Sequence, residues 1–331
     1  MPRLRDLGRR ALDAALEFSV VGSFSRVGPA IRRRLFRWTP RTGQPLVGHV
    51  IIVSGSTSGL GLECATQLAH LGASVILLVR DSEAGLRVCE RIVHSTGNPD
   101  VSVVVADLGE LDSVRRAAFE LRRYPAIHGL IHNAGALTKN FQVTTDGIEV
   151  TTATQLVGPF LLTTLLRDQL EAGRASVVWV TSGGMYTQPL DVGWLENPEH
   201  HYSGTVAYAR VKRAQVSLNA AWAPRLATSG ITMSAMHPGW VDTPGVRRSL
   251  PRFRRVMSML LRTPSEGVDT IVWLLVTPSR RTPPGTLWLD RRGRQLHRLR
   301  RTRRSDTELQ RQRLLSFCRT RSGTDFNETC S

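Results

Sequence analysis

Tyr208 and Lys212 stand four residues apart in the stretch "VAYARVKRAQ" (206–215) and could form an acid–base pair. Residues at this spacing share one face of a helix. A phenol has a pKa of about 10, and an ammonium group beside it favours the phenolate and lowers that pKa. The same spacing also arises by chance in many helices, so its surroundings must decide whether the pair is catalytic.

The rarity of lysine in this chain supports a special role for Lys212. Of the 44 Lys and Arg residues, only Lys139 and Lys212 are lysines. A guanidinium is planar and larger than an ammonium, so arginine cannot simply replace a lysine seated against a phenol. The sequence offers no comparable reason for Lys139.

A glycine-rich loop, "SGSTSGLG" (54–61), lies between a candidate strand and a candidate helix. Gly55, Gly59 and Gly61 permit a tight turn and let backbone N–H groups approach a pyrophosphate at the start of the helix. Because the loop follows the first strand of an alternating series, it predicts a dinucleotide site.

The end of the second candidate strand reads "LLVRD", with Arg80 followed by Asp81. An acid at this place normally binds the ribose hydroxyls of NAD, whereas a guanidinium suits the 2′-phosphate of NADP. Arg80 comes first, so we prefer NADP(H) as the cofactor and keep NAD(H) as the alternative.

Short β-branched runs alternate with helical stretches from residue 49 onward, which predicts an α/β doubly wound domain. Near-continuous apolar runs are typical of parallel strands that are buried on both faces. The candidate strands are residues 49–55, 73–79, 101–107, 127–133, 175–181 and 231–238, and residues 285–290 should form a last strand at one edge. The candidate helices are residues 61–71, 82–94, 111–122, 147–169 and 205–227.

The net charge of +17 is concentrated at the two ends of the chain. Residues 1–41 hold ten Arg against three acids, and residues 280–331 hold fourteen Arg against five acids. We therefore expect a basic amphipathic extension over 1–44, one domain over 45–292, and a basic, partly disordered tail over 293–331. Basic ends attract anionic membranes or nucleic acids, although solvated tails would have the same composition.

Composition points to a reducing compartment. Four scattered cysteines without metal-ligand spacing suggest free thiols and no metal site. The chain has no uninterrupted apolar stretch of about 18 residues, and Asp13 and Glu17 interrupt the first apolar run. We therefore expect a cytoplasmic protein without a cleaved signal peptide, with peripheral contact to a membrane as a hypothesis.

Six pieces of sequence occur in an order that resembles the short-chain dehydrogenase/reductase family over residues 45–290. They are the glycine loop, "DL" at 107–108, "HNAG" at 132–135, Ser182, "YARVK" and "HPGWVDT" at 237–243. "TSGGM", "HPGWVDTPGV" and "AYARVKRAQ" look most like the branch of member-12 and retinol-dehydrogenase-type reductases. The resemblance implies a single Rossmann-type domain with a mostly parallel sheet of about seven strands.

The resemblance also implies roles for individual residues. Tyr208 would protonate the carbonyl oxygen, Ser182 would stabilise the developing alkoxide, and Lys212 would hold the nicotinamide ribose. Asp107 would contact the adenine. The residues expected to bind the cofactor are Ser54, Gly55, Ser58, Gly59, Leu60, Gly61, Arg80, Asp107, Leu108, Asn133, Ala134, Gly135, Tyr208, Lys212, Pro238, Gly239, Val241 and Thr243.

One departure from the family concerns Gln155, which stands where the family has an asparagine that anchors a proton-relay water. Glutamine has the same amide on one more methylene, so it could serve, shift or weaken the relay. We therefore include Gln155 among the catalytic residues and keep a second hypothesis, a nucleotide-binding sensor or scaffold of reduced activity. Tyr202 lacks a lysine four residues on and is rejected as the acid.

The substrate should be apolar and bind beside residues 245–264, where Leu250, Phe253, Met257, Leu260 and Leu261 recur near helical spacing among arginines. A ketone, an aldehyde or an alcohol of retinoid, steroid or lipid type fits this expectation. A lid helix that packs on its own core would show the same pattern.

The family resemblance further implies a homodimer or homotetramer paired through helices at 147–170 and 205–225. No aromatic-interleaved basic stretch supports nucleic-acid binding, which we do not expect.

Overall fold

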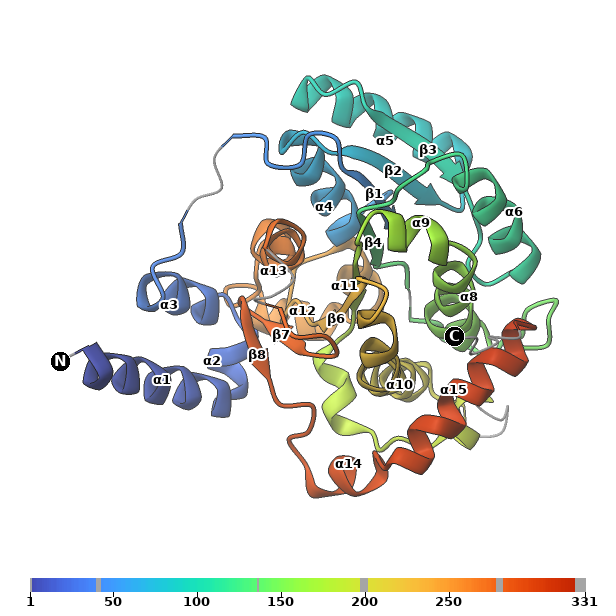
Figure 1. Ribbon diagram of the computed structural model, residues 1–331. Coiled ribbons are helices and arrows are strands. Elements are labelled where there is room, and N and C mark those ends of the chain that lie inside the picture. Colours follow the sequence, from blue (N-terminus) through green and yellow to red (C-terminus); the bar gives the residue numbers. More distant parts are fainter. Residues whose placement is uncertain (1, 40–42, 136, 197–201, 278–281, 325–331) are drawn as a thin grey trace.

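A parallel β-sheet forms the centre of the protein in the computed structural model (Figure 1). The structure describes residues 2–39, 43–135, 137–196, 202–277 and 282–324. Within them, eight strands are ordered β3-β2-β1-β4-β5-β6-β7-β8. The order reverses between β1 and β4, and in such sheets ligands bind outside the carboxyl ends of the strands at this point.

The strands form where the sequence places its β-branched runs. They are β1 (Val50–Ser54), β2 (Ser74–Val79), β3 (Val101–Val105), β4 (Gly129–His132), β5 (Ser176–Val180), β6 (Thr232–Met236), β7 (Leu287–Leu289) and β8 (Arg292–Arg294). Alternate residues of one strand enter opposite cores: Ile52 faces one layer of helices, while Ile51 and Val53 face the other. This two-sided burial explains the continuous apolar runs.

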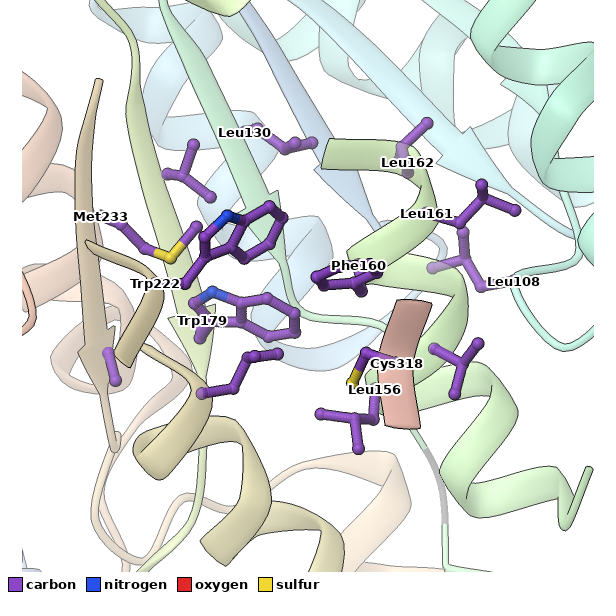
Figure 2. Packing of buried hydrophobic residues seen from close by; sticks show 14 of the residues in the cluster. Leu108, Leu130, Leu156, Phe160, Leu161, Leu162, Trp179, Trp222, Met233 and Cys318 are labelled. Carbon is purple, nitrogen blue, oxygen red and sulfur yellow. The ribbon is translucent and has the colours of Figure 1, made fainter. Parts of the chain in front are cut away.

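Helices cover both faces of the sheet. One layer contains α4 (Gly59–His70), α5 (Ser82–Thr96) and α13 (Pro264–Val276), and the other contains α6 (Leu111–Leu121), α8 (Gly158–Leu165) and α10 (Gly204–Ala227). In Figure 2, Trp179 of β5, Phe160 of α8 and Trp222 of α10 lie close together in the second layer. The rings of Phe160 and Trp222 are 4.6 Å apart.

The fold class predicted from the sequence is confirmed, with two differences in detail. The strand predicted for one edge, β7, pairs on its other side with an antiparallel strand, β8, so that β8 is the edge. The helix predicted over 147–169 is divided into α7 (Val150–Thr152), a π-helical turn (Ala153–Val157) and α8, and α9 (Arg167–Ala172) follows it. Helical periodicity does not reveal an inserted π turn, because the turn adds a single residue.

The N-terminal extension is folded onto the domain through buried ion pairs. It forms α1 (Pro2–Phe18), α2 (Val20–Phe24) and α3 (Val27–Leu35). Buried Arg32 donates to Asp13 at 2.7 Å and to Asp290, beyond β7, at 2.6 Å. Burial by itself would lower the pKa of Arg32, but the two carboxylates raise that pKa above its ordinary value. The acids that interrupt the first apolar run therefore face inward and hold this extension in place.

The C-terminal segment packs on the second helical layer. Residues 300–322 form α14 (Arg300–Ser305) and α15 (Glu308–Ser322), whereas we expected a partly disordered tail over 293–331, of which 325–331 lie outside the described residues. Leu314, Leu315 and Cys318 of α15 are buried. Figure 2 shows Cys318 beside Leu156. The arginines at other positions of α15 concealed this apolar contact in the sequence.

Candidate active site

The glycine loop is tied to the turn after β4 at the point where the strand order reverses. The Ser54 hydroxyl donates to Ile131 O at 3.0 Å and accepts from the backbone N–H groups of Asn133 and Ala134 at 3.0 and 3.1 Å. The Asn133 amide donates to the carbonyls of Ser54 and Gly55. One hydroxyl and one amide thus join two segments that are about eighty residues apart in the chain.

Close approach explains the glycines of this loop. A Cβ on Gly55, whose φ is +66°, would lie 2.7 Å from the Ala134 backbone, and a Cβ on Gly61 would lie 2.3 Å from the Gly55 carbonyl oxygen. Ser58 is the N-cap residue of α4, and its side chain makes no capping hydrogen bond. The first N–H groups of α4 therefore point from a narrow loop at the carboxyl edge of the sheet, as an anion site requires.

The segment after β6 closes the other side of the loop. Thr243 caps α11 (Pro244–Ser249) and lies against Gly59, where a Cβ would be 3.5 Å from the Thr243 Cβ. Leu60 and Val241 both contact Gly267 of α13. Pro238 and Gly239 form the turn that leads into this segment, and Gly239 has a φ of +77°. Residues 238–243 thus border the glycine loop, and their contact with a cofactor stays a prediction.

The tips of β2 and β3 carry the residues predicted for the adenosine side. Arg80 is exposed at the end of β2, while Asp81 caps α5 by accepting from the Ala84 N–H at 3.0 Å. Asp107 follows β3 and accepts from the Gly109 N–H at 2.8 Å, and Leu108 is buried beside it. Asp81, the acid that could bind the ribose hydroxyls of NAD, is therefore bound to the first turn of α5, and the Arg80 guanidinium faces solvent.

Ser182 and Tyr208 meet across the end of β5. Ser182 begins a 3₁₀ helix (Gly183–Thr187), and this helix packs on α10 where Gly184 faces Ala209. Tyr208, in the second turn of α10, is partly buried. Burial raises the pKa of the Tyr208 phenol above its ordinary value of 10.0, and a hydrogen bond with Ser182 acts in the opposite direction. At neutral pH the phenol is thus protonated and can donate a proton.

Lys212 lies one turn beyond Tyr208 and is 3% exposed. Its ammonium donates to Val180 O at 2.9 Å and lies 5.3 Å from the centre of the Tyr208 ring. Burial lowers the pKa of Lys212 from 10.5 to about 7. The pKa of Tyr208 is raised through burial in this structure, so the lowering that we expected from Lys212 stays a prediction.

Gln155 is in the π-helical turn and faces the turn after β4. A Cβ on Gly135 would lie 2.6 Å from the Gln155 amide oxygen, so the side chain packs directly on this glycine. The Gln155 backbone carbonyl accepts from the Gln215 side chain at 2.6 Å, which links the π turn to α10 just beyond Lys212. The amide therefore lies between the two segments that carry Asn133 and Lys212.

A nicotinamide dinucleotide fits this edge of the domain. The glycine loop is narrow, and side chains in place of its glycines would fill it; it contains Ser54, Gly55, Ser58, Gly59, Leu60 and Gly61. Arg80 and Asp107 lie at the adenosine end of this edge. Tyr208 and Lys212 lie at the other end. Among the described residues no group of three or more His, Cys, Asp or Glu could hold a metal ion.

Sequence reasoning missed two residues next to this site, Phe24 and Arg262. The Phe24 ring packs against Gly183, directly after Ser182, and Arg262 donates to the backbone of α2. Their partners lie more than 150 positions away in the chain, so no local pattern could have indicated these contacts.

The fold and the site together define a short-chain dehydrogenase. The family model described as short chain dehydrogenase matches residues 49–252, and the chain belongs to the short-chain dehydrogenase/reductase family.

Known proteins support the same assignment. The chain is 35% identical to dehydrogenase/reductase SDR family member 12 of Bos taurus over 76% of this chain and 79% of that protein. It is 34% identical to human retinol dehydrogenase 11 over 75% of this chain and 79% of that protein. A solved short chain dehydrogenase/reductase family protein superimposes with a TM-score of 0.59 at 26% identity, covering 74% of this chain and 96% of the other.

Replacing Lys212 by arginine should remove most activity although the charge is kept. The lowered pKa of Lys212 corresponds to a burial penalty of about 5 kcal/mol on its charged form, and an arginine cannot escape that penalty by losing its proton. We expect turnover to fall by about a hundredfold in a coupled assay of nicotinamide absorbance. Lys139→Arg, at an exposed position, is the matched control and should leave turnover unchanged. Equal activity of the two variants would contradict a special role for Lys212.

Proposed function

We propose that this protein is an NADP(H)-dependent oxidoreductase that interconverts an apolar ketone or aldehyde and the corresponding alcohol. The observation that carries the proposal is the contact between Ser182 and Tyr208, with Lys212 buried one turn further on, beside the glycine loop at the reversal of strand order. A structural role alone gives no reason for a hydroxyl, a phenol and a buried amine to converge at this edge.

The residues of the chain have distinct tasks in this reaction. A bound nicotinamide cofactor supplies or accepts the hydride. In reduction, the Tyr208 hydroxyl donates its proton to the substrate oxygen, while the Ser182 hydroxyl donates a hydrogen bond to the same oxygen as negative charge develops there. Lys212 then has a phenolate beside it, which favours its own ammonium form. The raised pKa of Tyr208 means that the phenol holds its proton at neutral pH and can donate it in the reduction.

An apolar substrate is supported by the walls beside the site. Trp240 follows Gly239, and its ring meets that of Phe253 in α12 (Pro251–Met257) edge to face at 5.4 Å. Asp242 pairs with Arg247 and Arg254 at 3.0 and 2.9 Å, and these hydrogen bonds lower the pKa of Asp242 to about 2. The arginines that flank the apolar stripe are thus partly neutralised. A retinoid-, steroid- or lipid-like carbonyl fits such a surface, and one relative is named for retinol.

NADP(H) is supported over NAD(H) by the β2 tip. Asp81, the acid that could have bound ribose hydroxyls, caps α5 instead, and Arg80 faces solvent. A variant of actinorhodin polyketide ketoreductase, 22% identical with a TM-score of 0.56 and covering 72% of this chain and 94% of its own, was solved with NADPH.

A sensor or scaffold of reduced activity is the second candidate, and the packing of Gln155 favours it. The Gln155 amide is pressed against Gly135, where a shorter asparagine would leave more space. If this contact displaces the relay water, the cofactor would bind without rapid turnover. Cofactor binding combined with the absence of turnover on a carbonyl panel would support this candidate.

Tyr208→Phe tests the main proposal. Removing the proton donor should lower kcat/KM for carbonyl reduction by about 10²–10⁴, the usual contribution of general acid catalysis. The dissociation constant for NADPH, measured by nicotinamide fluorescence, should change less than about threefold because the ring and Lys212 remain.

Tyr202→Phe is the matched control for this experiment. The Tyr202 hydroxyl bonds to Thr138 at 2.6 Å and to Glu149 at 2.9 Å, which is a structural role. A similar loss in both variants would argue against Tyr208 as the acid, and absence of NADPH and NADH binding to the unaltered protein would overturn the proposal.

Arg80→Leu should reduce the preference for NADPH. A charge-assisted hydrogen bond to a phosphate is worth about 1.5–3 kcal/mol, so the NADPH dissociation constant should rise roughly 10- to 100-fold while that of NADH stays the same. Arg87→Leu on α5, where Arg87 pairs with Glu83, is the control. An unchanged ratio of the two dissociation constants would show that Arg80 does not read the 2′-phosphate.

We also propose that the protein contacts an anionic membrane beside its substrate site. Phe18 and Met259 are 93% and 85% exposed. The N-terminal helices and the segment that holds Met259 are joined where the Arg26 N–H donates to Leu260 O at 3.0 Å. Exposed arginines at 252 and 255 accompany them, and apolar side chains among basic ones are typical of surfaces that bind anionic lipid. Among the described residues, no helix is both long and apolar enough to cross a bilayer.

Point variants test this contact better than deletion of residues 1–41, because deletion would also remove buried Phe24 and Arg32. Phe18→Glu with Met259→Glu should lower co-sedimentation with phosphatidylserine vesicles by about tenfold or more, because both changes place negative charge against the lipid. Phe119→Glu on α6, 78% exposed, is the control and should bind normally. Failure of the unaltered protein to bind these vesicles at low salt would overturn the proposal.

The remaining expectations about partners and location stay predictions. Pairing through the helices at 147–170 and 205–225 would have to use the parts of α8 and α10 that α15 leaves uncovered. The cytoplasmic location and the absence of nucleic-acid binding also stay predictions.

A further inference from the structure

We infer that Phe24, in the N-terminal extension, is a positioning residue of the active site: its ring sets the spacing between the loop that carries Ser182 and the Pro238–Gly239 turn. The inference rests on the proposed function for its catalytic consequence, while its structural part can be tested without any substrate. Phe24 lies outside the residues matched by the family model.

The backbone around Phe24 is held by a buried arginine. Arg262 donates to three successive carbonyls, those of Ser23 at 2.6 Å and of Phe24 and Ser25 at 3.1 Å. The other side of its guanidinium pairs with Asp290 at 2.7 Å. Three carbonyls in a row are thus fixed by one side chain, which is itself fixed by a carboxylate. Phe24 therefore has little freedom to move.

The Phe24 ring is inserted between the two loops. On one side a Cβ on Gly183 would lie 2.1 Å from the ring, so the residue after Ser182 has space for a hydrogen only. On the other side the ring stacks on His237 at 4.9 Å and 24°, directly before Pro238, and lies 5.6 Å from the Trp240 ring. Phe24 is 4% exposed, so its ring is buried between the two loops.

The backbone of Phe24 also binds the Pro238–Gly239 turn. The Trp240 N–H donates to Phe24 O at 2.8 Å, and a Cβ on Gly239 would lie 2.6 Å from the same oxygen. The Phe24 ring thus contacts the Ser182 loop, while the Phe24 carbonyl holds the turn that borders the glycine loop. If the ring were lost, the two loops could approach each other, and misplacement of a reacting group by about 1 Å can cost 10²-fold in rate.

Hydrogen exchange measured by mass spectrometry tests the structural part. In Phe24→Ala, amides in residues 182–187 and 237–241 should exchange about tenfold faster or more, with exchange in β1 to β3 unchanged. Phe119→Ala on α6, 78% exposed, is the matched control and should alter neither region. Unchanged exchange in both loops, or equal acceleration throughout the domain, would overturn the inference, because the second result describes an ordinary core residue.

A paired substitution gives the test a second, independent arm and covers the case that Phe24→Ala does not fold. Gly183→Ala alone should disturb both loops strongly, because its methyl group would overlap the Phe24 ring. In the presence of Phe24→Leu or Phe24→Ala, the same Gly183→Ala change should accelerate hydrogen exchange in the two loops at least tenfold less, because the Phe24 ring no longer occupies the space beside residue 183. If Gly183→Ala accelerated hydrogen exchange in the loops equally with and without the Phe24 ring, the inference would be overturned.

Kinetic measurements test whether the spacing of the two loops affects catalysis. Phe24→Ala should lower kcat by about 10- to 100-fold with a much smaller change in the NADPH dissociation constant, and Phe24→Leu should recover part of the loss. An unchanged kcat in a chain whose loops exchange faster would overturn the catalytic consequence. If the unaltered protein reduces no carbonyl compound, the proposed function fails, and the exchange experiments still decide the role of Phe24.

Discussion

The carboxylate of Asp290 is the group on which the arrangement around the site depends. It lies just beyond β7 and pairs with Arg32 of α3 at 2.6 Å and with Arg262 at 2.7 Å, all three side chains being buried. Two guanidinium groups cannot remain so close in the interior without an anion between them. Loss of one partner from such a buried set typically costs 3–5 kcal/mol because charges are left uncompensated. The N-terminal helices, the end of the substrate segment and the sheet edge are therefore joined by one carboxylate.

This cluster changes how the domain boundaries should be understood. The family model ends near residue 252, yet Arg262 and Asp290 hold the backbone that places Phe24 beside Ser182. The basic ends of the chain are therefore not separate appendages. Asp13 illustrates this: burial by itself would raise its pKa, but Arg294 and Arg32 hold that pKa below its ordinary value, so an N-terminal acid is tied to the last residue of β8.

The sequence predicted the central sheet because the sheet depends on local pattern, whereas Ser182 was identified only through the resemblance to a family. Periodicity identified the parallel strands, and the four-residue spacing placed the phenol and the amine on one helix face. What it could not predict depends on distant contacts or on burial. Phe24 acquires its role from Gly183 and His237, and the pKa of Lys212 falls to about 7 through burial that no spacing reveals. The docking of α15 was hidden because its short apolar run, residues 314–318, is flanked by arginines on both sides.

The distance along the chain between Arg32 and Asp290, 258 positions, has a consequence for biosynthesis. Domains generally fold as the ribosome extends them from the N-terminus, at about 5–20 residues per second. Asp13 and Glu17 can pair with Arg32 early, whereas Asp290 becomes available only after a further 258 residues have been synthesised. The apolar residues under α15, Leu156 among them, stay uncovered until α15 itself has been synthesised (Figure 2). The attachment of the N-terminal helices to Asp290 and the covering of these apolar residues by α15 are therefore late events in the folding of this protein.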